Sequence, residues 1–337
     1  MPTIRVLVAA AAAVTASPAA ADTRVAFALD WKFEAPSAPY FLALDKGYYQ
    51  EEGLDVSIDS GSGSTQTIPR IAAGNYDLGF GDINSLIKFK DQNPDASVIA
   101  VMMTYETPPF AIVSLAGRGI DAGDPASLEG RTLGAPPPDA AFAQWPIFVE
   151  VNDLDTSTIT IESVGFPVRE PMLAAGDVDG IFGYSFSSVQ NLKLNDVPDE
   201  DIVVMLMAEH GLALYGNAVL ANTDFAAENP GAVEGFIRAT IKGWRDTVAD
   251  PEAAIPHVLE RNDVARAEVE LDRLRMVLAD NVLTPVVAEN GIGGVDMDRL
   301  ARSIDQIAVA YEYTAKPSAE EIFTEAYLPP PDARQID

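Results

Sequence analysis

Apolar and polar positions alternate in short blocks along most of the chain, and the period of the alternation changes from block to block. Residues 23–30, 54–60 and 76–82 are short and mostly apolar, which is typical of strands buried in a sheet. Residues 39–53 and 66–74 carry apolar side chains at helical spacing, and each run ends in a glycine. Because helices alternate with strands, the pattern predicts a parallel sheet with helices on both faces.

The same alternation returns further along the chain. Residues 167–176 predict a helix, and they lie among runs that predict strands at 110–120, 157–166, 178–184 and 202–209. The segment AAGDVDGIFGY at 174–184 also echoes AAGNYDLGFGD at 72–82. The chain therefore predicts two α/β halves of similar construction, whose loops face each other across a cleft.

The length of 337 residues exceeds what one hydrophobic core normally serves, so two domains are expected. Near residues 108–116 and 210–218 the pattern passes from one unit to the other, and after Asn229 it is mostly helical. We expect domain I to hold residues 22–112 and 217–337, and domain II to hold residues 113–216. The predicted fold class is α/β, with two doubly wound domains joined by a hinge of two strands.

The first 21 residues differ from the rest and predict a secretory signal peptide. They hold one early positive charge, Arg5, then an apolar stretch of about a dozen residues, and end in Ala19-Ala20-Ala21 before Asp22. The apolar stretch is too short for a membrane span, which needs roughly 20 residues. We therefore expect residues 1–21 to be removed on export and the mature protein to be soluble in the periplasm.

Composition narrows the classes of partner. The formal net charge is −29, and nucleic acids and anionic membranes both require a basic surface. The chain has no cysteine, which excludes disulfides, thiolate metal sites and cysteine nucleophiles. We expect no nucleic-acid partner, no metal and no cofactor.

Aromatic and acidic residues gather where the predicted strands end, and in such sheets ligands bind beyond the carboxyl ends of the strands. Lys32 and Arg169 are the basic residues near these ends, whereas a sulfonate or nitrate site would need an arginine fork or a similar donor. A flat, neutral or cationic heteroaromatic ligand fits better, because rings stack on its faces and a carboxylate accepts a hydrogen bond from its amine.

Several of these residues also have a purely structural interpretation. Trp31 could close the domain edge, and Tyr215 could pack the hinge. The segment Gly61-Ser62-Gly63-Ser64 could bind a ligand at a helix start or simply form a capped turn, and Asp82 could cap the next helix. Trp244 lies at helical spacing with apolar neighbours, which favours a core position.

Enzyme chemistry finds little support in the sequence. Of the two histidines, His257 lies in a predicted helix among polar residues, and His210 has no acidic and nucleophilic partners at motif spacing. No GxSxG, HExxH or phosphate-loop pattern occurs. A secreted enzyme that uses the cleft remains the alternative of a different class, and it would require an acid–base pair there.

Seven segments resemble one family of proteins. They are LDW at 29–31, PYFLALDKGYYQEEGLDV at 39–56, PRIAAGNYDLGFGD at 69–82, LEGRTLGAP at 128–136, EPMLAAGDVDGIFGY at 170–184, YGNAVLAN at 215–222 and GFIRATIKGWRDTVADPEAA at 235–254. The chain resembles the periplasmic substrate-binding proteins of ABC importers, in the NMT1/THI5-like group that includes sulfonate, taurine, nitrate and thiamine-pyrimidine-precursor binders. The resemblance implies a type II periplasmic binding protein fold and a monomer that delivers its ligand to an ABC permease in the inner membrane.

Within this group, the DW and YGN segments resemble the branch that binds thiamine pyrimidine precursors. An alkyl sulfonate such as taurine, or another small organic anion, is the alternative ligand. The chain departs from the pattern at Ala35-Pro36-Ser37-Ala38, where an Asn-His pair is usual, and it lacks the cysteine-rich iron motif of the related pyrimidine-synthesising enzymes. The expected ligand contacts are Trp31, Tyr40, Ser62, Gly63, Asp82, Asn84, Tyr105, Glu106, Pro138, Asp139, Phe166, Tyr184, Tyr215 and Asn217.

Overall fold

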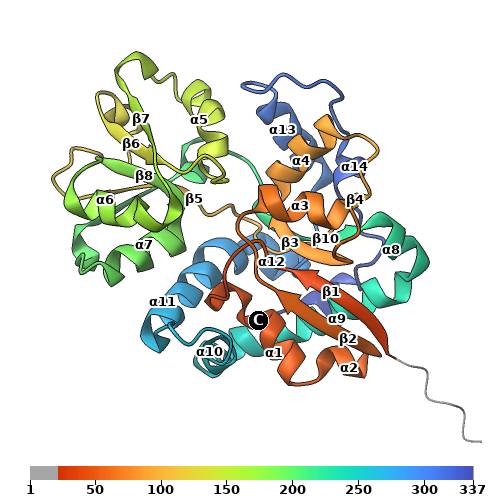
Figure 1. Ribbon diagram of the computed structural model, residues 1–337. Helices are drawn as coiled ribbons and strands as arrows, with labels where there is room; N and C mark the ends of the chain where they lie inside the picture. Colours follow the sequence, from red (N-terminus) through yellow and green to blue (C-terminus); the bar gives the residue numbers. More distant parts are fainter. Residues whose placement is uncertain (1–21, 337) are drawn as a thin grey trace, which may run out of the picture.

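The computed structural model describes residues 22–336, so the predicted signal peptide lies outside the described residues. Two five-stranded sheets form two lobes that lie side by side (Figure 1). The first sheet has the order β2-β1-β3-β10-β4, and its strands are β1 (Thr23–Ala28), β2 (Leu54–Asp59), β3 (Leu78–Asp82), β4 (Val98–Met103) and β10 (Asn217–Asn222). The second has the order β7-β6-β8-β5-β9, and its strands are β5 (Phe110–Leu115), β6 (Thr132–Ala135), β7 (Thr160–Ser163), β8 (Gly180–Tyr184) and β9 (Ile202–Leu206).

Each sheet is mixed, which differs from the predicted all-parallel sheet. In the first sheet β1 pairs in parallel with β2 and β3, but β10 runs antiparallel between β3 and β4. In the second, β6 pairs in parallel with β7 and β8, and β5 runs antiparallel between β8 and β9. The physical reason is the chain path, because β5 and β10 are the first strands after each passage between lobes and enter their sheets from the opposite end.

Helices flank both sheets. The first lobe carries α1 (Ala38–Asp45), α2 (Tyr48–Glu51), α3 (Ser64–Ala72), α4 (Ile83–Gln92), α8 (Thr223–Glu228), α9 (Pro230–Ala249), α10 (Pro251–Leu259), α11 (Ala267–Val277), α12 (Pro285–Asn290), α13 (Met297–Ile307) and α14 (Ala319–Ile322). The second carries α5 (Trp145–Val151), α6 (Arg169–Ala175) and α7 (Ser185–Leu194). The single helix predicted over 39–53 is two helices, because Gly47 adopts a positive φ of 76° between them. Across residues 22–336, no helix is both long and apolar enough to cross a membrane.

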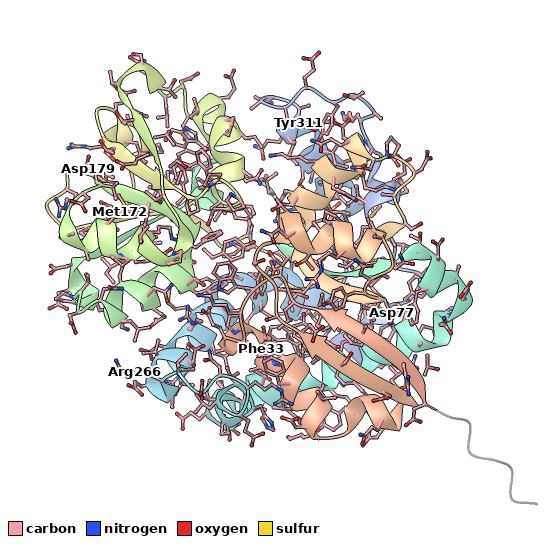
Figure 2. The ribbon with its side chains drawn as sticks, in the orientation of Figure 1. Phe33, Asp77, Met172, Asp179, Arg266 and Tyr311 are labelled. Carbon is pink, nitrogen blue, oxygen red and sulfur yellow. The ribbon has the colours of Figure 1, made fainter. Side chains whose placement is uncertain are left out.

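The sequence echo corresponds to a repeated local structure. Asp77 accepts a hydrogen bond from the Ala26 N–H at 2.8 Å, and Asp179 accepts one from the Thr132 N–H at 2.9 Å. Figure 2 shows Asp77 in the first lobe and Asp179 in the second. Each carboxylate therefore ties the start of a strand to its neighbour, which is why the two segments share an acidic residue at the same position.

Residues 104–109 and 207–216 connect the lobes, and neither segment is a strand. The expected boundary at residue 112 falls inside β5, which pairs along its whole length with strands of the second sheet. We therefore propose that the first domain ends before Phe110 and resumes at Asn217. Trp244 is fully buried in the core of the first lobe, as expected.

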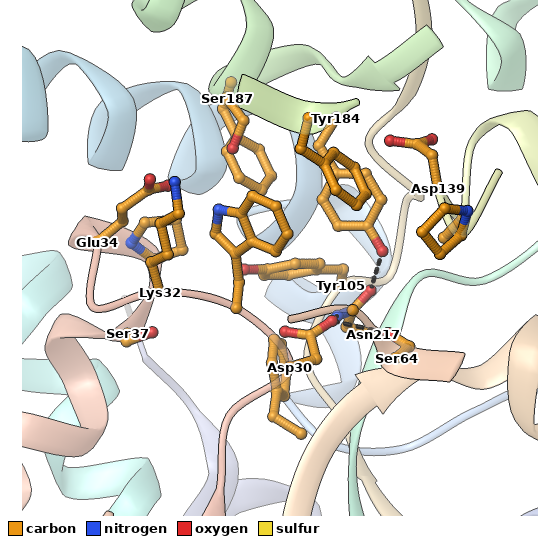
Figure 3. A pocket seen from close by; sticks show the side chains of 18 of the residues that line it. Asp30, Lys32, Glu34, Ser37, Ser64, Tyr105, Asp139, Tyr184, Ser187 and Asn217 are labelled. Atoms are coloured by element: carbon orange, nitrogen blue, oxygen red, sulfur yellow. Dashed lines mark hydrogen bonds between the residues drawn. The ribbon is translucent and has the colours of Figure 1, made fainter. Parts of the chain in front are cut away.

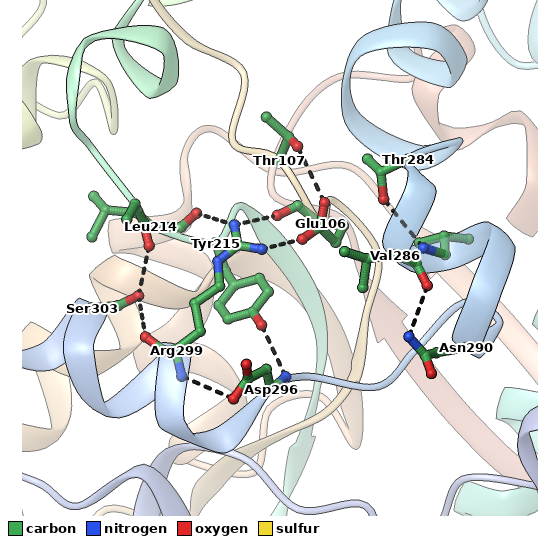
Figure 4. A network of polar contacts seen from close by, with 12 residues as sticks. Glu106, Thr107, Leu214, Tyr215, Thr284, Val286, Asn290, Asp296, Arg299 and Ser303 are labelled. Carbon is green, nitrogen blue, oxygen red and sulfur yellow. Dashed lines mark hydrogen bonds and ion pairs between the residues drawn. The ribbon is translucent and has the colours of Figure 1, made fainter.

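One arginine of α13 holds both connections (Figure 4). Arg299 pairs with the Glu106 carboxylate and donates to the Glu106 carbonyl at 3.0 Å in the first connection. It also donates to the Leu214 carbonyl at 2.8 Å in the second, and its guanidinium lies 3.9 Å from the centre of the Tyr215 ring. Arg299 thus ties both connections to the first lobe at once, beside single contacts such as that of Asn281 with the Thr107 carbonyl.

Candidate functional site

A cavity of about 80 Å³ lies between the two lobes (Figure 3). Both lobes contribute to its wall, mostly with residues that follow the carboxyl ends of strands. The lining residues are Asp30, Trp31, Lys32, Glu34, Pro36, Ser37, Gly63, Ser64, Phe80, Tyr105, Pro138, Asp139, Ala140, Phe166, Arg169, Tyr184, Phe186, Ser187 and Asn217. This position agrees with the rule that ligands of open α/β sheets bind beyond the strand ends.

Asp30 is a buried acidic residue of the cavity wall that two side chains hold in place. It follows β1, and its Oδ2 accepts hydrogen bonds from Ser64 Oγ at 2.7 Å and from Asn217 Nδ2 at 2.8 Å. The Gly63 N–H donates to the Asp30 carbonyl at 2.6 Å, which fixes the glycine loop against the same residue. Both of these bonds use Oδ2, so the other carboxylate oxygen, Oδ1, accepts from neither Ser64 nor Asn217.

Burial raises the pKa of Asp30 to about 6, although the hydrogen bonds from Ser64 and Asn217 oppose the shift. The nearby Asp82 carboxylate adds to the rise. Near neutral pH this carboxylate is therefore charged but under-stabilised. A ligand that donates a hydrogen bond or brings positive charge would stabilise it, whereas an anion would be repelled.

Two contacts join the lobes across the cavity. The ring of Trp31, in the first lobe, meets the ring of Phe166, in the second, edge to face at a centroid distance of 4.9 Å. The Tyr184 hydroxyl donates to Asn217 Oδ1 at 2.9 Å, as the dashed line in Figure 3 shows. Asn217 thereby links Tyr184 to Asp30 in one chain of hydrogen bonds, and the lobes are closed on each other.

The arginine that lines the cavity, Arg169 of the second lobe, is fully engaged within the protein. Arg169 donates to Asp139 Oδ2 at 2.9 Å, to Glu170 Oε1 at 2.6 Å and to the Phe182 carbonyl at 3.0 Å. Asp139 Oδ1 accepts from two further backbone N–H groups, at 2.8 and 3.1 Å. The cavity wall therefore contains no free guanidinium at this position, because two carboxylates neutralise it.

Eight of the expected contacts line the cavity: Trp31, Gly63, Tyr105, Pro138, Asp139, Phe166, Tyr184 and Asn217. Asp82 and Asn84 do not. Asp82 caps α4 by accepting from the Ser85 N–H at 2.8 Å, and Asn84 donates to the Tyr215 carbonyl at 2.7 Å. The alternative interpretation of Asp82 as a helix cap thus describes its position.

Four other expected contacts also lie away from the cavity wall. Tyr40 is fully buried in the core of the first lobe, and Ser62 is exposed and bonded to Gln66. Glu106 and Tyr215 belong to the hinge network around Arg299. Tyr40 lies inside α1 rather than at a strand end, and for the other three the sequence did not show which way each side chain points.

The structure adds cavity residues that the expected set omitted. Asp30 follows β1, and the sequence had already shown Lys32 and Arg169 as the basic residues near the strand ends, whereas Glu34 lies in an irregular segment with no periodic signal. Phe80 reaches the cavity from within β3 and meets Tyr105 edge to face at 5.4 Å. The other additions are Pro36, Ser37, Ser64, Ala140, Phe186 and Ser187.

Neither histidine belongs to the cavity wall. The His210 ring lies 2.8 Å from the Ala122 carbonyl, and the His257 ring lies 2.7 Å from Asp45 Oδ2. Within residues 22–336, no group of three or more histidine, aspartate or glutamate side chains is arranged to hold a metal ion.

Two α/β lobes that close on a shared cavity define the class of periplasmic binding protein folds. The chain belongs to the family described as "NMT1/THI5 like", whose model matches residues 35–254. The resemblance inferred from the sequence motifs is therefore confirmed, as is the predicted α/β fold class, although the sheets are mixed and the two connections between the lobes are not strands.

Relatives in this family include binding proteins and enzymes. The chain is 25% identical to the riboflavin-binding protein RibY of Chloroflexus aurantiacus over 95% of this chain and 91% of that protein. It is 27% identical to a formylaminopyrimidine-binding protein of Halalkalibacterium halodurans, over 78% and 79%. It is also 25% identical to a 4-amino-5-hydroxymethyl-2-methylpyrimidine phosphate synthase of Aspergillus parasiticus, over 72% and 71%.

A solved structure shares the fold. The periplasmic aliphatic sulphonate binding protein SsuA of Escherichia coli superposes with a TM-score of 0.69, covering 90% of this chain and 92% of that one. Its sequence is only 14% identical, so this likeness concerns the fold alone.

Proposed function

We propose that this protein is the periplasmic solute-binding component of an ABC importer and that it captures a single-ring, amine-bearing heteroaromatic compound of the pyrimidine class. The observation that carries the proposal is the closed interlobe cavity, in which a buried carboxylate, Asp30, lies among aromatic side chains. The formylaminopyrimidine-binding relative supports the same class of ligand.

The size of the cavity favours one ring over several. A buried water molecule needs roughly 10 to 15 Å³ on this scale, and the cavity measures about 80 Å³. It therefore holds on the order of six waters, which is about the bulk of one substituted ring. A three-ring flavin such as the ligand named for the RibY relative would require the lobes to open.

The charge of the cavity argues against the anionic alternatives. Asp30, Glu34 and Asp139 face it, and Arg169 is bonded to two carboxylates. Lys32 is the one lining cation outside that cluster, and its ammonium lies 5.4 Å from the centre of the Trp31 ring. A sulfonate or nitrate would meet net negative charge without a bidentate donor, whereas an amine finds acceptors.

Transport follows from the two-lobed architecture. Ligand binding between lobes stabilises the closed form, which a permease in the inner membrane recognises, and a hinged binder of this kind acts as a monomer. Export by the segment 1–21 and a periplasmic location belong to the same proposal. Binding without covalent chemistry agrees with the two binding proteins among the relatives and with the remote positions of both histidines.

A ligand panel tests the proposal. Mature protein is melted with aminopyrimidines, riboflavin, taurine, nitrate and aromatic acids, and hits are measured by titration calorimetry. A true ligand at 100 times its Kd stabilises the folded state by about 2.7 kcal/mol. Stabilisation by aminopyrimidines supports the proposal. Stabilisation by taurine or riboflavin alone refutes the ligand class, and turnover of any compound refutes the binding role.

A further inference from the structure

The cavity wall contains a second carboxylate with an unused acceptor. Glu34 follows Trp31 in the irregular segment after β1, and its side chain is 13% exposed. Its Oε2 atom is buried and accepts no hydrogen bond from the described residues. Burial raises the pKa of the Glu34 carboxyl group although the Arg273 guanidinium opposes the rise. A buried carboxylate oxygen without a donor is unfavourable, so this position is not explained by stability.

The arginine beside Glu34 contacts four groups and makes no short hydrogen bond to the Glu34 carboxylate. Arg273, on α11, lies 3.4 Å from Glu34 Oε2 and 3.3 Å from Glu270. It also reaches the Phe186 carbonyl and the Asn191 side chain, each at 3.4 Å. All four contacts are longer than the 2.7 to 2.9 Å typical of a charge-assisted hydrogen bond.

The corresponding cluster in the second lobe shows the contrast. Arg169 also faces two carboxylates, but its bonds to Asp139 and Glu170 measure 2.9 and 2.6 Å. Asp139 therefore has its donors within the protein, whereas Glu34 retains capacity for one more. Each cluster thus has one arginine and two carboxylates, but only in the Arg169 cluster does the carboxylate that lines the cavity receive short hydrogen bonds from the protein.

We propose that Glu34 is a specificity-determining residue that accepts a hydrogen bond from a second donor group of the ligand, while Asp30 accepts from the first. Arg273 acts as a positioning residue that holds Glu34 at the wall without saturating it. The inference rests on the proposed function, and it narrows the ligand to heteroaromatic compounds with donor groups at two positions. A diaminopyrimidine, or an aminopyrimidine with a hydroxyl substituent, meets this requirement.

Two probes separate the second donor from the first. Kd values of 4-aminopyrimidine and 2,4-diaminopyrimidine are measured by calorimetry on the wild-type protein, Glu34→Gln and Glu170→Gln. The wild-type protein should prefer the diamine by about tenfold or more, the range for a hydrogen bond to a charged group. Glu34→Gln should lose that preference. Glu170→Gln makes the same chemical change in the Arg169 cluster, at a residue that does not line the cavity, and should keep that preference, which controls for long-range electrostatics.

The unliganded protein supplies a second measurement that needs no ligand. Because Glu34 pairs with Arg273 only at 3.4 Å, Glu34→Gln should lower the melting temperature less than Glu170→Gln, in which Arg169 loses a charged partner bonded at 2.6 Å. A diamine preference that survives in Glu34→Gln, or a melting temperature that falls as far as in Glu170→Gln, overturns the inference and leaves the pyrimidine assignment standing. If neither probe binds the wild-type protein, the proposed function and the inference both fail.

Discussion

Replacing Asp30 by asparagine should stabilise the unliganded protein above pH 6, although it removes a group proposed to bind the ligand. Asparagine has nearly the same shape and keeps an oxygen that Ser64 and Asn217 can donate to, at the positions where they now bond at 2.7 and 2.8 Å. The substitution therefore removes the charge and little else. Function and stability oppose each other at this position, as is common in binding sites.

The magnitude follows from the pKa of Asp30, which burial raises from 3.8 to about 6. Since the folded-state pKa lies above the unfolded value, the folded protein binds the proton more tightly. The contribution of Asp30 to stability is thus fully present below about pH 4 and is lost as the pH rises through about 6. Two pKa units correspond to about 3 kcal/mol, so Asp30→Asn should gain about that much at pH 8 and almost nothing at pH 4.

Urea unfolding followed by circular dichroism at pH 4 and pH 8 measures the difference between the two proteins. Asp246→Asn is a control of opposite sign. Burial would raise the pKa of Asp246, but the Lys46 ammonium and the Tyr48 hydroxyl outweigh it and lower that pKa. This variant should lose stability at pH 8. The reasoning is refuted if Asp30→Asn is less stable than the wild-type protein at pH 8, or if its effect is the same at both pH values.

Three further substitutions test the cavity and the hinge. Trp31→Ala should weaken ligand binding by roughly 1 to 3 kcal/mol, the range for a ring stacked on an aromatic side chain, and an unchanged affinity would mean that Trp31 has only a structural role. The change in tryptophan fluorescence on ligand binding should vanish in Trp31→Phe and persist in the control Trp145→Phe. Tyr184→Phe removes the hydrogen bond across the cleft and should raise the Kd by about two- to tenfold in calorimetry; an unaltered Kd would show that this bond does not hold the closed form. Arg299→Met leaves the buried Glu106 carboxylate unpaired and should reduce the free energy of unfolding by about 3 kcal/mol. The double variant Arg299→Met, Glu106→Gln should recover part of this loss, and a double variant as unstable as the single one would contradict the pairing.

The similar segments at 72–82 and 174–184 show why so much of the fold could be predicted from the sequence. In each half a glycine with positive φ ends a helix, Gly74 and Gly176, and an aspartate then ties the following strand to its neighbour. These are local features, so periodicity and turn residues predict them. The direction of β5 and β10 was not predictable in this way, because it depends on where the chain enters the other lobe.

The candidate site could be predicted from the sequence only in part. Strand ends predicted where Trp31, Phe166 and Tyr184 would lie, because carboxyl ends of strands meet at one edge of a sheet. The same reasoning placed Asp82 in the cleft, but its carboxylate turns back to cap α4. One rotation of a side chain decides between these outcomes, and nothing in the local sequence fixes it.

By itself the amino-acid sequence determined the two α/β halves, the family, the absence of thiol chemistry and the scarcity of basic groups near the strand ends. These properties depend on local periodicity, composition and short motifs. Only the tertiary structure decided that Arg169 is neutralised while Glu34 keeps an unused acceptor, and that Asp30 is buried enough to shift its pKa. Hydrogen-bond satisfaction and desolvation depend on residues that are distant in sequence, such as Asn217 beside Asp30 and Arg273 beside Glu34.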